Sequence, residues 1–126
     1  MKKILLAEDD KGLSRSVDIL LTLEGYQVIS VYNGEEALNQ LCTQKYDLLI
    51  TDIVMPQLNG IELITQIRMI SPDLPIIVVS GNLNETYAAE LKRAGVQAIL
   101  PKPIHPDLFR RAIRKALANR ITSVRE

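Results

Sequence analysis

Hydrophobic positions in this chain follow two alternating spacings. Short apolar runs are followed by longer stretches in which apolar residues recur every three or four positions. The first pattern is typical of buried strands and the second of amphipathic helices. The runs predict strands at residues 4–7, 27–31, 48–51, 76–79 and 98–100. The longer stretches predict helices from residue 10 to near 25, and at 35–44, 60–70, 85–93 and 106 to about 119.

Residues with distinct backbone preferences mark the ends of these helices. Asp10 is a suitable N-cap for the first helix, and Gly25 and Gly95 suit the C-terminal ends of the first and fourth helices. Residues 33–34, Asn-Gly, predict a turn before the second helix. The expected inward face of the last helix consists of Leu108, Ile113 and Leu117.

Five strands that each precede a helix predict an α/β fold with a doubly wound parallel sheet. Parallel neighbours need a crossover connection, which is right-handed and usually helical, so helices are expected on both faces of the sheet. We find no repeat, linker or low-complexity segment in the 126 residues. We therefore expect one domain over residues 1–120 and a C-terminal tail over 121–126.

Charge and hydropathy exclude several classes of partner. Lysine and arginine together number 15, as do aspartate and glutamate, so no net charge recruits nucleic acid or an anionic membrane. No apolar run is long enough to span a bilayer. Basic residues nevertheless gather near the C-terminal end, as a solvated helix face or as a docking face for a partner. These residues are Arg110, Arg111, Arg114, Lys115, Arg120 and Arg125.

Cysteine usage indicates a reducing compartment. The single cysteine, Cys42, cannot form an internal disulfide, and it lies among helix-pattern residues where we expect it to be packed. The apolar start of the chain stops at Ala7 and acidic residues follow, which does not fit an export signal. We therefore expect a cytoplasmic protein.

A charged residue or a serine follows four of the five predicted strands, whereas the second strand is followed by an uncharged Tyr-Asn pair. The charged residues and the serine are Glu8, Asp9 and Asp10 after the first strand, Asp52 after the third, Ser80 after the fourth and Lys102 after the fifth. The carboxyl ends of parallel strands lie at one edge of a sheet, where α/β proteins bind their ligands. Clustered carboxylates without histidine or cysteine favour a hard cation such as Mg²⁺. An ammonium and a hydroxyl group beside them suit a phosphoryl group, so the set predicts phosphate chemistry with a metal.

Sequence motifs around these residues resemble the receiver domain of bacterial two-component response regulators. The acidic residues after the first strand, "TDIVMPQLNG" around the third, "VVSG" at the end of the fourth and "LPKP" at the end of the fifth occur in order and at matching intervals. The resemblance covers nearly the whole chain. It implies the flavodoxin-like strand order 2-1-3-4-5, which places the first and third strands side by side.

The resemblance also implies roles for the acidic residues. Asp52 is expected to accept a phosphoryl group from the phosphohistidine of a histidine kinase or histidine phosphotransfer protein, forming an acyl phosphate. Glu8, Asp9 and Asp52 are expected to hold Mg²⁺ together with the backbone carbonyl of Val54. Asp10 is expected to cap a helix instead of binding the metal.

Further roles follow from the same resemblance. Lys102 is expected to pair with the phosphoryl oxygens, and the Ser80 hydroxyl is expected to move to them after transfer. The peptide bond between Lys102 and Pro103 is expected to be cis. The switch position three residues before the lysine is usually aromatic in this family, whereas here it is Ile99. This difference puts signal transmission by a rotating aromatic ring in question.

Two side chains are expected to set the lifetime of the phosphorylated state. In this family the residues two positions after the acceptor and after the hydroxyl, here Val54 and Asn82, lean over the phosphoryl group. Hydrolysis needs a water molecule held in line, and a valine side chain offers it no hydrogen bond. We therefore expect the acyl phosphate to be comparatively long-lived.

The expected function is a phosphoacceptor switch and not an enzyme acting on other substrates. The switch catalyses its own phosphorylation and dephosphorylation and changes its binding to an unknown downstream protein, as a monomer or weak dimer. The chain would act by itself or as a phosphorelay carrier if it is complete, and otherwise as the receiver part of a larger regulator or hybrid kinase. An aspartate-nucleophile phosphatase of the haloacid dehalogenase type needs a second aspartate where Val54 stands. A flavin carrier needs a phosphate loop in place of the acidic residues Glu8 and Asp9. A receiver that works without phosphorylation would have lost a site residue, and none is missing.

Overall fold

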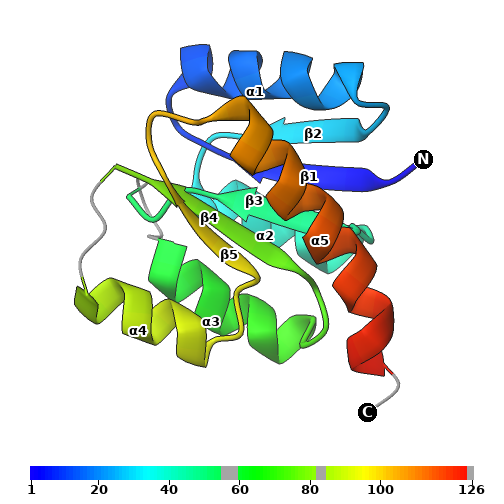
Figure 1. Cartoon of the computed structure of the whole chain (residues 1–126). Coiled ribbons are helices and arrows are strands. Elements are labelled where there is room, and N and C mark those ends of the chain that lie inside the picture. Colours follow the sequence, from blue (N-terminus) through cyan, green and yellow to red (C-terminus); the bar gives the residue numbers. More distant parts are fainter. Residues whose placement is uncertain (55–59, 82–84, 125–126) are drawn as a thin grey trace.

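Five parallel strands form a single sheet in the order β2-β1-β3-β4-β5 (Figure 1). In the computed structural model, the described residues are 1–54, 60–81 and 85–124. The strands are β1 (Lys3–Ala7), β2 (Gln27–Val31), β3 (Leu48–Thr51), β4 (Ile76–Ser80) and β5 (Ala98–Pro101). The strand order expected from the family resemblance is confirmed. Strands β1 and β3 are neighbours although they are separated by a helix, a strand and a further helix along the chain.

Helices cover both faces of the sheet (Figure 1). They are α1 (Lys11–Leu23), α2 (Gly34–Thr43), α3 (Gly60–Ile70), α4 (Glu85–Arg93) and α5 (Pro106–Val124). Helices α1 and α5 pack on one face, and α2, α3 and α4 pack on the other. Each face has its own cluster of buried apolar side chains. The predicted doubly wound α/β fold is therefore confirmed.

Alternation of side chains along the strands divides the core into these two clusters. In β1, Ile4 and Leu6 face α1 and α5, whereas Leu5 and Ala7 face the other helices. All residues of β3 and β4 are buried, because both strands are covered by helices on two sides. The outer strands β2 and β5 are only partly covered. The acidic residues after β1 and β3 thus lie at the most deeply packed part of the sheet edge.

Helix ends follow the local capping rules. Oδ1 of Asp10 accepts a hydrogen bond from the Leu13 amide at 3.1 Å, so the predicted cap of α1 is confirmed. Oδ1 of Asn33 accepts one from the Glu36 amide at 2.8 Å, and α2 therefore begins at Gly34, one residue before the predicted start. The glycine expected at the end of α1, Gly25, has a positive φ of 93°, which L side chains rarely adopt.

The last helix differs from its prediction in length and in its inward face. Helix α5 continues to Val124, so residues 121–124, which we expected to form a tail, are helical. No glycine or proline follows residue 106 to end the helix earlier. Leu108, predicted to point inward, is 49% exposed, whereas Phe109 is fully buried. The spacing of Phe109, Ile113 and Ala116 sets the inward face, and Leu108 lies one position away from it.

The side chain of Cys42 is exposed, so the prediction that it is packed inside is wrong. Its helix α2 turns Ala37 and Leu41 toward the sheet instead. No helix in the described chain combines the length and apolar character that crossing a membrane requires.

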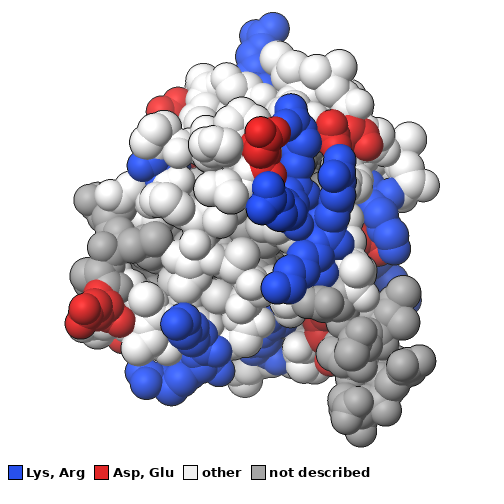
Figure 2. All heavy atoms as spheres, in the orientation of Figure 1, with Lys and Arg blue, Asp and Glu red and all other residues white. Residues whose placement is uncertain are grey.

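Basic side chains gather along α5, where Figure 2 shows a stripe of lysine and arginine on this side of the molecule. Arg110 and Arg114 form ion pairs with Glu24 at the C-terminal end of α1, at 3.4 Å and 3.2 Å. Surface ion pairs contribute little to stability, typically about 0–1 kcal/mol. Part of the basic cluster thus connects α5 to α1, and a docking role for the remainder stays a prediction.

Candidate functional site

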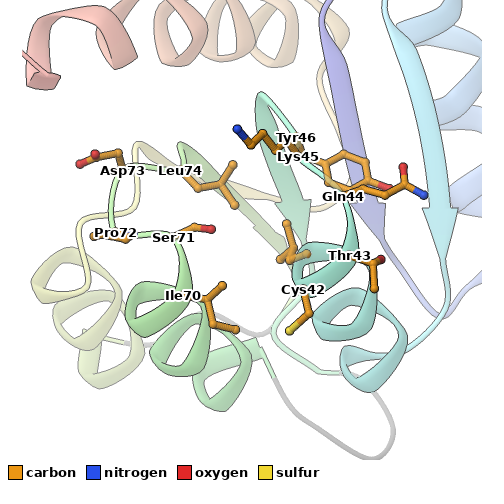
Figure 3. A pocket seen from close by; sticks show the side chains of 11 residues that line it. Cys42, Thr43, Gln44, Lys45, Tyr46, Ile70, Ser71, Pro72, Asp73 and Leu74 are labelled. Atoms are coloured by element: carbon orange, nitrogen blue, oxygen red, sulfur yellow. The ribbon is translucent and has the colours of Figure 1, made fainter.

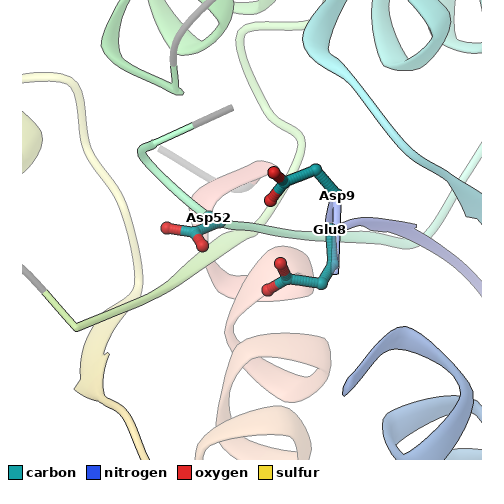
Figure 4. Close-up of side chains that lie close together, drawn as sticks. All are labelled: Glu8, Asp9 and Asp52. Carbon is teal, nitrogen blue, oxygen red and sulfur yellow. The ribbon is translucent and has the colours of Figure 1, made fainter. Parts of the chain in front are cut away.

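Three carboxylates converge where β1 and β3 end. Ala7 pairs with Thr51 across these neighbouring strands, which places the following residues, Glu8 and Asp52, side by side. The side chains of Glu8, Asp9 and Asp52 point toward a common space (Figure 4). Each contributes an oxygen atom, and these oxygens all lie within 4.8 Å of one another. Glu8 and Asp52 are buried, with exposed fractions of 5% and 6%, whereas Asp9 is exposed.

Lys102 brings a positive charge to the buried pair of carboxylates. Its Nζ lies 2.9 Å from Oε1 of Glu8 and 2.6 Å from Oδ2 of Asp52. Lys102 follows β5, and its amide donates a hydrogen bond to the Ser80 carbonyl at 3.1 Å. The register between β4 and β5 thus directs the lysine toward the acids.

The surroundings shift the pKa values of both partners. Burial raises the pKa of Glu8, and the hydrogen bond and charge of Lys102 offset this only in part. Burial lowers the pKa of Lys102, but its hydrogen bonds to Asp52 and Glu8 and their charges outweigh burial, so the net shift is upward. Lys102 therefore stays charged near neutral pH.

Backbone amides orient the carboxylates further. The Val54 amide donates to Oδ1 of Asp52 at 3.2 Å, and the Asp10 amide donates to Oε2 of Glu8 at 3.1 Å. Each of these two acids thus has one oxygen bound to Lys102 and the other to an amide. Both carboxylates are held in place by groups from two different loops.

The donor set fits a hard divalent cation. Glu8, Asp9 and Asp52 offer only carboxylate oxygens, which Mg²⁺ and Ca²⁺ prefer over softer ligands. Asp10 is occupied with the Leu13 amide as the helix cap, as the sequence predicted. The Val54 amide contacts Asp52, and the expected role of the Val54 carbonyl as a metal ligand stays a prediction.

Other predicted residues lie around this centre. Ser80 is the last residue of β4 and is buried. Ile99 in β5 is half-buried and packs against the core cluster under α2, α3 and α4. The side chain of Val54 is 56% exposed. Asn82, predicted to influence the lifetime, lies outside the described residues. The peptide bond between Lys102 and Pro103 is cis, as predicted.

Thr51 directly precedes Asp52, and our reading of the sequence did not single it out. Its hydroxyl donates to the backbone carbonyl of Asp52 at 2.9 Å, and its exposed fraction is 1%. The available signal was a hydroxyl side chain at the end of an otherwise apolar run, Leu48 to Ile50.

A hollow of about 540 Å³ lies at the opposite edge of the sheet (Figure 3). Its lining comes from the ends of α2 and α3 and the segments that lead into β3 and β4, including Cys42, Tyr46 and Ile70. The carboxylates follow these strands instead of preceding them. The hollow is therefore separate from the acidic site.

The family model of the response regulator receiver domain matches residues 4–114. The chain belongs to this family. The matched segment contains the three carboxylates and Lys102, so the whole acidic site lies within the receiver domain.

Curated relatives of this receiver differ in length. The response regulator receiver protein CpdR of Brucella abortus is 38% identical over 105 residues, which cover 83% of this chain and 88% of CpdR. The transcriptional regulatory protein GlrR of Escherichia coli is 34% identical over 114 residues, which cover 90% of this chain and 26% of GlrR. The chain thus spans about a quarter of the length of GlrR.

Solved receiver structures share the fold throughout. A CheY-like receiver domain protein from Methanospirillum hungatei superposes with a TM-score of 0.94 at 26% identity, over 98% of both chains. The HemR receiver domain from Leptospira biflexa has a TM-score of 0.87 at 26% identity, over 93% of this chain and 94% of that one.

Proposed function

We propose that this receiver is a phosphoacceptor switch in which Asp52 takes a phosphoryl group from a histidine kinase or a histidine phosphotransfer protein. The observation that carries the proposal is the position of Asp52, a buried carboxylate with Lys102 Nζ at 2.6 Å and Glu8 and Asp9 within reach of a shared cation. Membership of the response regulator family supports a kinase as the donor.

In the proposed reaction, a carboxylate oxygen of Asp52 attacks the phosphorus atom of a phosphohistidine. The new O–P bond forms an acyl phosphate, the P–N bond breaks, and the imidazole keeps the electron pair of that bond. Lys102 holds the charge on the phosphoryl oxygens, which it can reach because its ammonium already touches Asp52. Ser80 donates its hydroxyl to a phosphoryl oxygen after transfer.

In this proposal Glu8, Asp9, Asp52 and the Val54 carbonyl would hold Mg²⁺, which would supply positive charge beside the phosphoryl group. The buried position of Glu8 and Asp52 strengthens these electrostatic interactions, since little water screens them. The exposed Asp9 leaves one side of the site open to the donor.

The output of the switch is a change in partner binding. Because Ile99 has no aromatic ring, the change is not transmitted by a rotating tyrosine or phenylalanine at this position. The match covers 88% of the receiver protein CpdR, and by analogy with CpdR we propose a receiver that acts by itself or as a phosphorelay carrier. The relation to GlrR supports the alternative, in which the receiver is part of a longer regulator. In either case the proposed location is the cytoplasm.

We propose a switch in preference to a turnover phosphatase, because the second aspartate of the dehalogenase motif is replaced by Val54, whose side chain is largely exposed. The decisive experiment is incubation with acetyl phosphate and Mg²⁺ followed by intact mass spectrometry. The wild type should gain one phosphoryl group, and Asp52→Asn should gain none. Asp73→Asn changes an exposed acid in the segment before β4 and is the matched control. Labelling of Asp52→Asn at the wild-type rate would refute the assignment of the acceptor.

A further inference from the structure

Thr51 is the polar residue of an otherwise apolar row of side chains that runs across the sheet. In this row Val31 pairs with Ala7, Ala7 with Thr51, Thr51 with Val78, and Val78 with Ile99. Valine has nearly the shape of threonine and would suit this environment without any polar group. A buried hydroxyl lowers stability unless it forms a hydrogen bond. The contact that the hydroxyl makes therefore indicates what it does in this row.

The Thr51 hydroxyl binds the backbone of the proposed acceptor. Oγ1 donates to the Asp52 carbonyl at 2.9 Å, while the Asp52 amide donates to the Ala7 carbonyl at 3.1 Å. The side chain of Asp52 is bound by the Val54 amide and by Lys102. The backbone amide, the backbone carbonyl and both carboxylate oxygens of Asp52 thus each form a hydrogen bond.

The hydrogen bond from Thr51 lies where it can affect the backbone between Asp52 and Val54. The Asp52 carbonyl belongs to the peptide unit that joins Asp52 to Ile53, immediately beyond the end of β3. Here the chain leaves the sheet. Two residues further on, the Val54 amide donates a hydrogen bond back to Oδ1 of Asp52. Fixing the Asp52 carbonyl therefore fixes the peptide unit from which the chain continues to the Val54 amide.

We propose that Thr51 is a positioning residue for Asp52. Its hydroxyl fixes the peptide unit after the acceptor and so holds the Asp52 carboxylate and the Val54 backbone in the arrangement that receives the metal and the phosphoryl group. This inference deepens the proposed function and rests on it for its effect on phosphorylation. The effect of the Thr51 hydroxyl on the backbone of the metal-free protein does not depend on the proposed function.

Two substitutions separate the hydroxyl from the packing of Thr51. Thr51→Val keeps the volume and removes the hydroxyl, whereas Thr51→Ser keeps the hydroxyl and removes a methyl group. If Thr51 only fills space, the serine variant should be the impaired one. If Thr51 positions Asp52, the valine variant should be impaired and the serine variant should behave as the wild type at the site.

The first measurement is hydrogen–deuterium exchange of the Val54 amide in metal-free protein. We expect Thr51→Val to exchange roughly two- to tenfold faster than the wild type, the range that corresponds to the net value of one hydrogen bond. Thr51→Ser should exchange at the wild-type rate. Equal exchange in the wild type and Thr51→Val would overturn the proposal.

The second measurement is the rate of phosphorylation by acetyl phosphate at saturating Mg²⁺, with the melting temperature recorded for each variant. We expect the phosphorylation of Thr51→Val to be slower than that of the wild type by a factor of roughly two to ten. Thr51→Ser should be phosphorylated at the wild-type rate. A slow serine variant beside a normal valine variant would overturn the proposal in favour of packing. If the wild type takes up no phosphoryl group, the proposed function fails, and the exchange measurement still decides the role of Thr51.

Discussion

Lys102 Nζ lies 2.6 Å from Oδ2 of Asp52, although the two residues are 50 positions apart in the chain. The same ammonium contacts Glu8, so two buried carboxylates share a single cation. Removing one partner of a buried ion pair leaves the other charge without compensation, which is more costly than the loss of an exposed pair. This arrangement makes the stability of the protein sensitive to Lys102.

We predict that Lys102→Met lowers the free energy of unfolding of the metal-free protein by about 1–3 kcal/mol, because Glu8 and Asp52 lose their shared counter-charge. Urea unfolding at neutral pH with a chelator present measures the change. Lys92→Met removes an exposed lysine of α4 and should leave the stability within about 0.5 kcal/mol of the wild type. Equal stability of the two variants would contradict the structural role of the Lys102 ammonium.

Mg²⁺ should raise the melting temperature of the wild type, because a ligand that binds only the folded state stabilises it. The double variant Glu8→Gln and Asp9→Asn should lose this response, since it removes the charges of two of the three clustered carboxylates. Differential scanning fluorimetry over a Mg²⁺ titration provides the comparison. A full response in the double variant would place the cation elsewhere.

The side chain of Val54 should slow the loss of phosphate from Asp52, because an isopropyl group cannot hold the attacking water. We expect Val54→Asn to hydrolyse about tenfold faster, which corresponds to ~1.4 kcal/mol of barrier. Val54→Ile keeps the apolar character and is the control. The decay of the phosphorylated form, followed by intact mass spectrometry at fixed Mg²⁺ and temperature, tests this prediction. The shielding argument is wrong if the asparagine variant is no faster.

Arg68 should be important for the attachment of α4. Its guanidinium donates hydrogen bonds to the backbone carbonyls of Ala94 (2.7 Å), Leu74 (2.7 Å), Gly95 (3.1 Å), Pro72 (3.2 Å) and Ser71 (3.3 Å). Burial lowers the pKa of Arg68, as expected for a half-buried cation. The bonds connect the segment before β4 with the turn after α4.

We predict that Arg68→Lys lowers the free energy of unfolding by about 1–3 kcal/mol, since an ammonium cannot reproduce the planar fork of donors. Amide exchange at the C-terminal end of α4 should also accelerate. Arg93→Lys, at an exposed position on α4, is the matched control. The prediction fails if the two variants unfold at the same urea concentration.

Substitutions of the adjacent residues Leu108 and Phe109 test which face of α5 is buried against the sheet. Phe109 is fully buried and Leu108 is 49% exposed. Phe109→Ala should destabilise the protein by about 3–5 kcal/mol, as expected for a large core side chain replaced by alanine. Leu108→Ala should cost about 0.5 kcal/mol or less, as at most surface positions. Urea unfolding of both variants measures the difference, and a larger loss for Leu108→Ala would contradict the observed face.

The sequence by itself determined the order of the elements and the residues that follow each strand. Apolar spacing and capping groups act over a few neighbouring residues, so Asp10 could be identified as a cap and the runs around Leu49 and Val78 as strands. Since parallel strands end at one edge, Glu8, Asp52 and Lys102 could be placed at one site before any distance was known. The strand order itself came from the family resemblance.

Only the tertiary structure decided which of these groups touch and how. The two contacts of Lys102 and the hydrogen bonds from Arg68 to the Ala94 and Gly95 carbonyls join segments that lie far apart in the chain. The hydrogen bond from Thr51 to the carbonyl of the adjacent Asp52 depends on how the backbone leaves β3. The exposure of Cys42 and Leu108 likewise depends on the angle at which each helix meets the sheet. Periodicity locates an apolar face to within about one residue, and packing against the sheet selects the side chains that are buried.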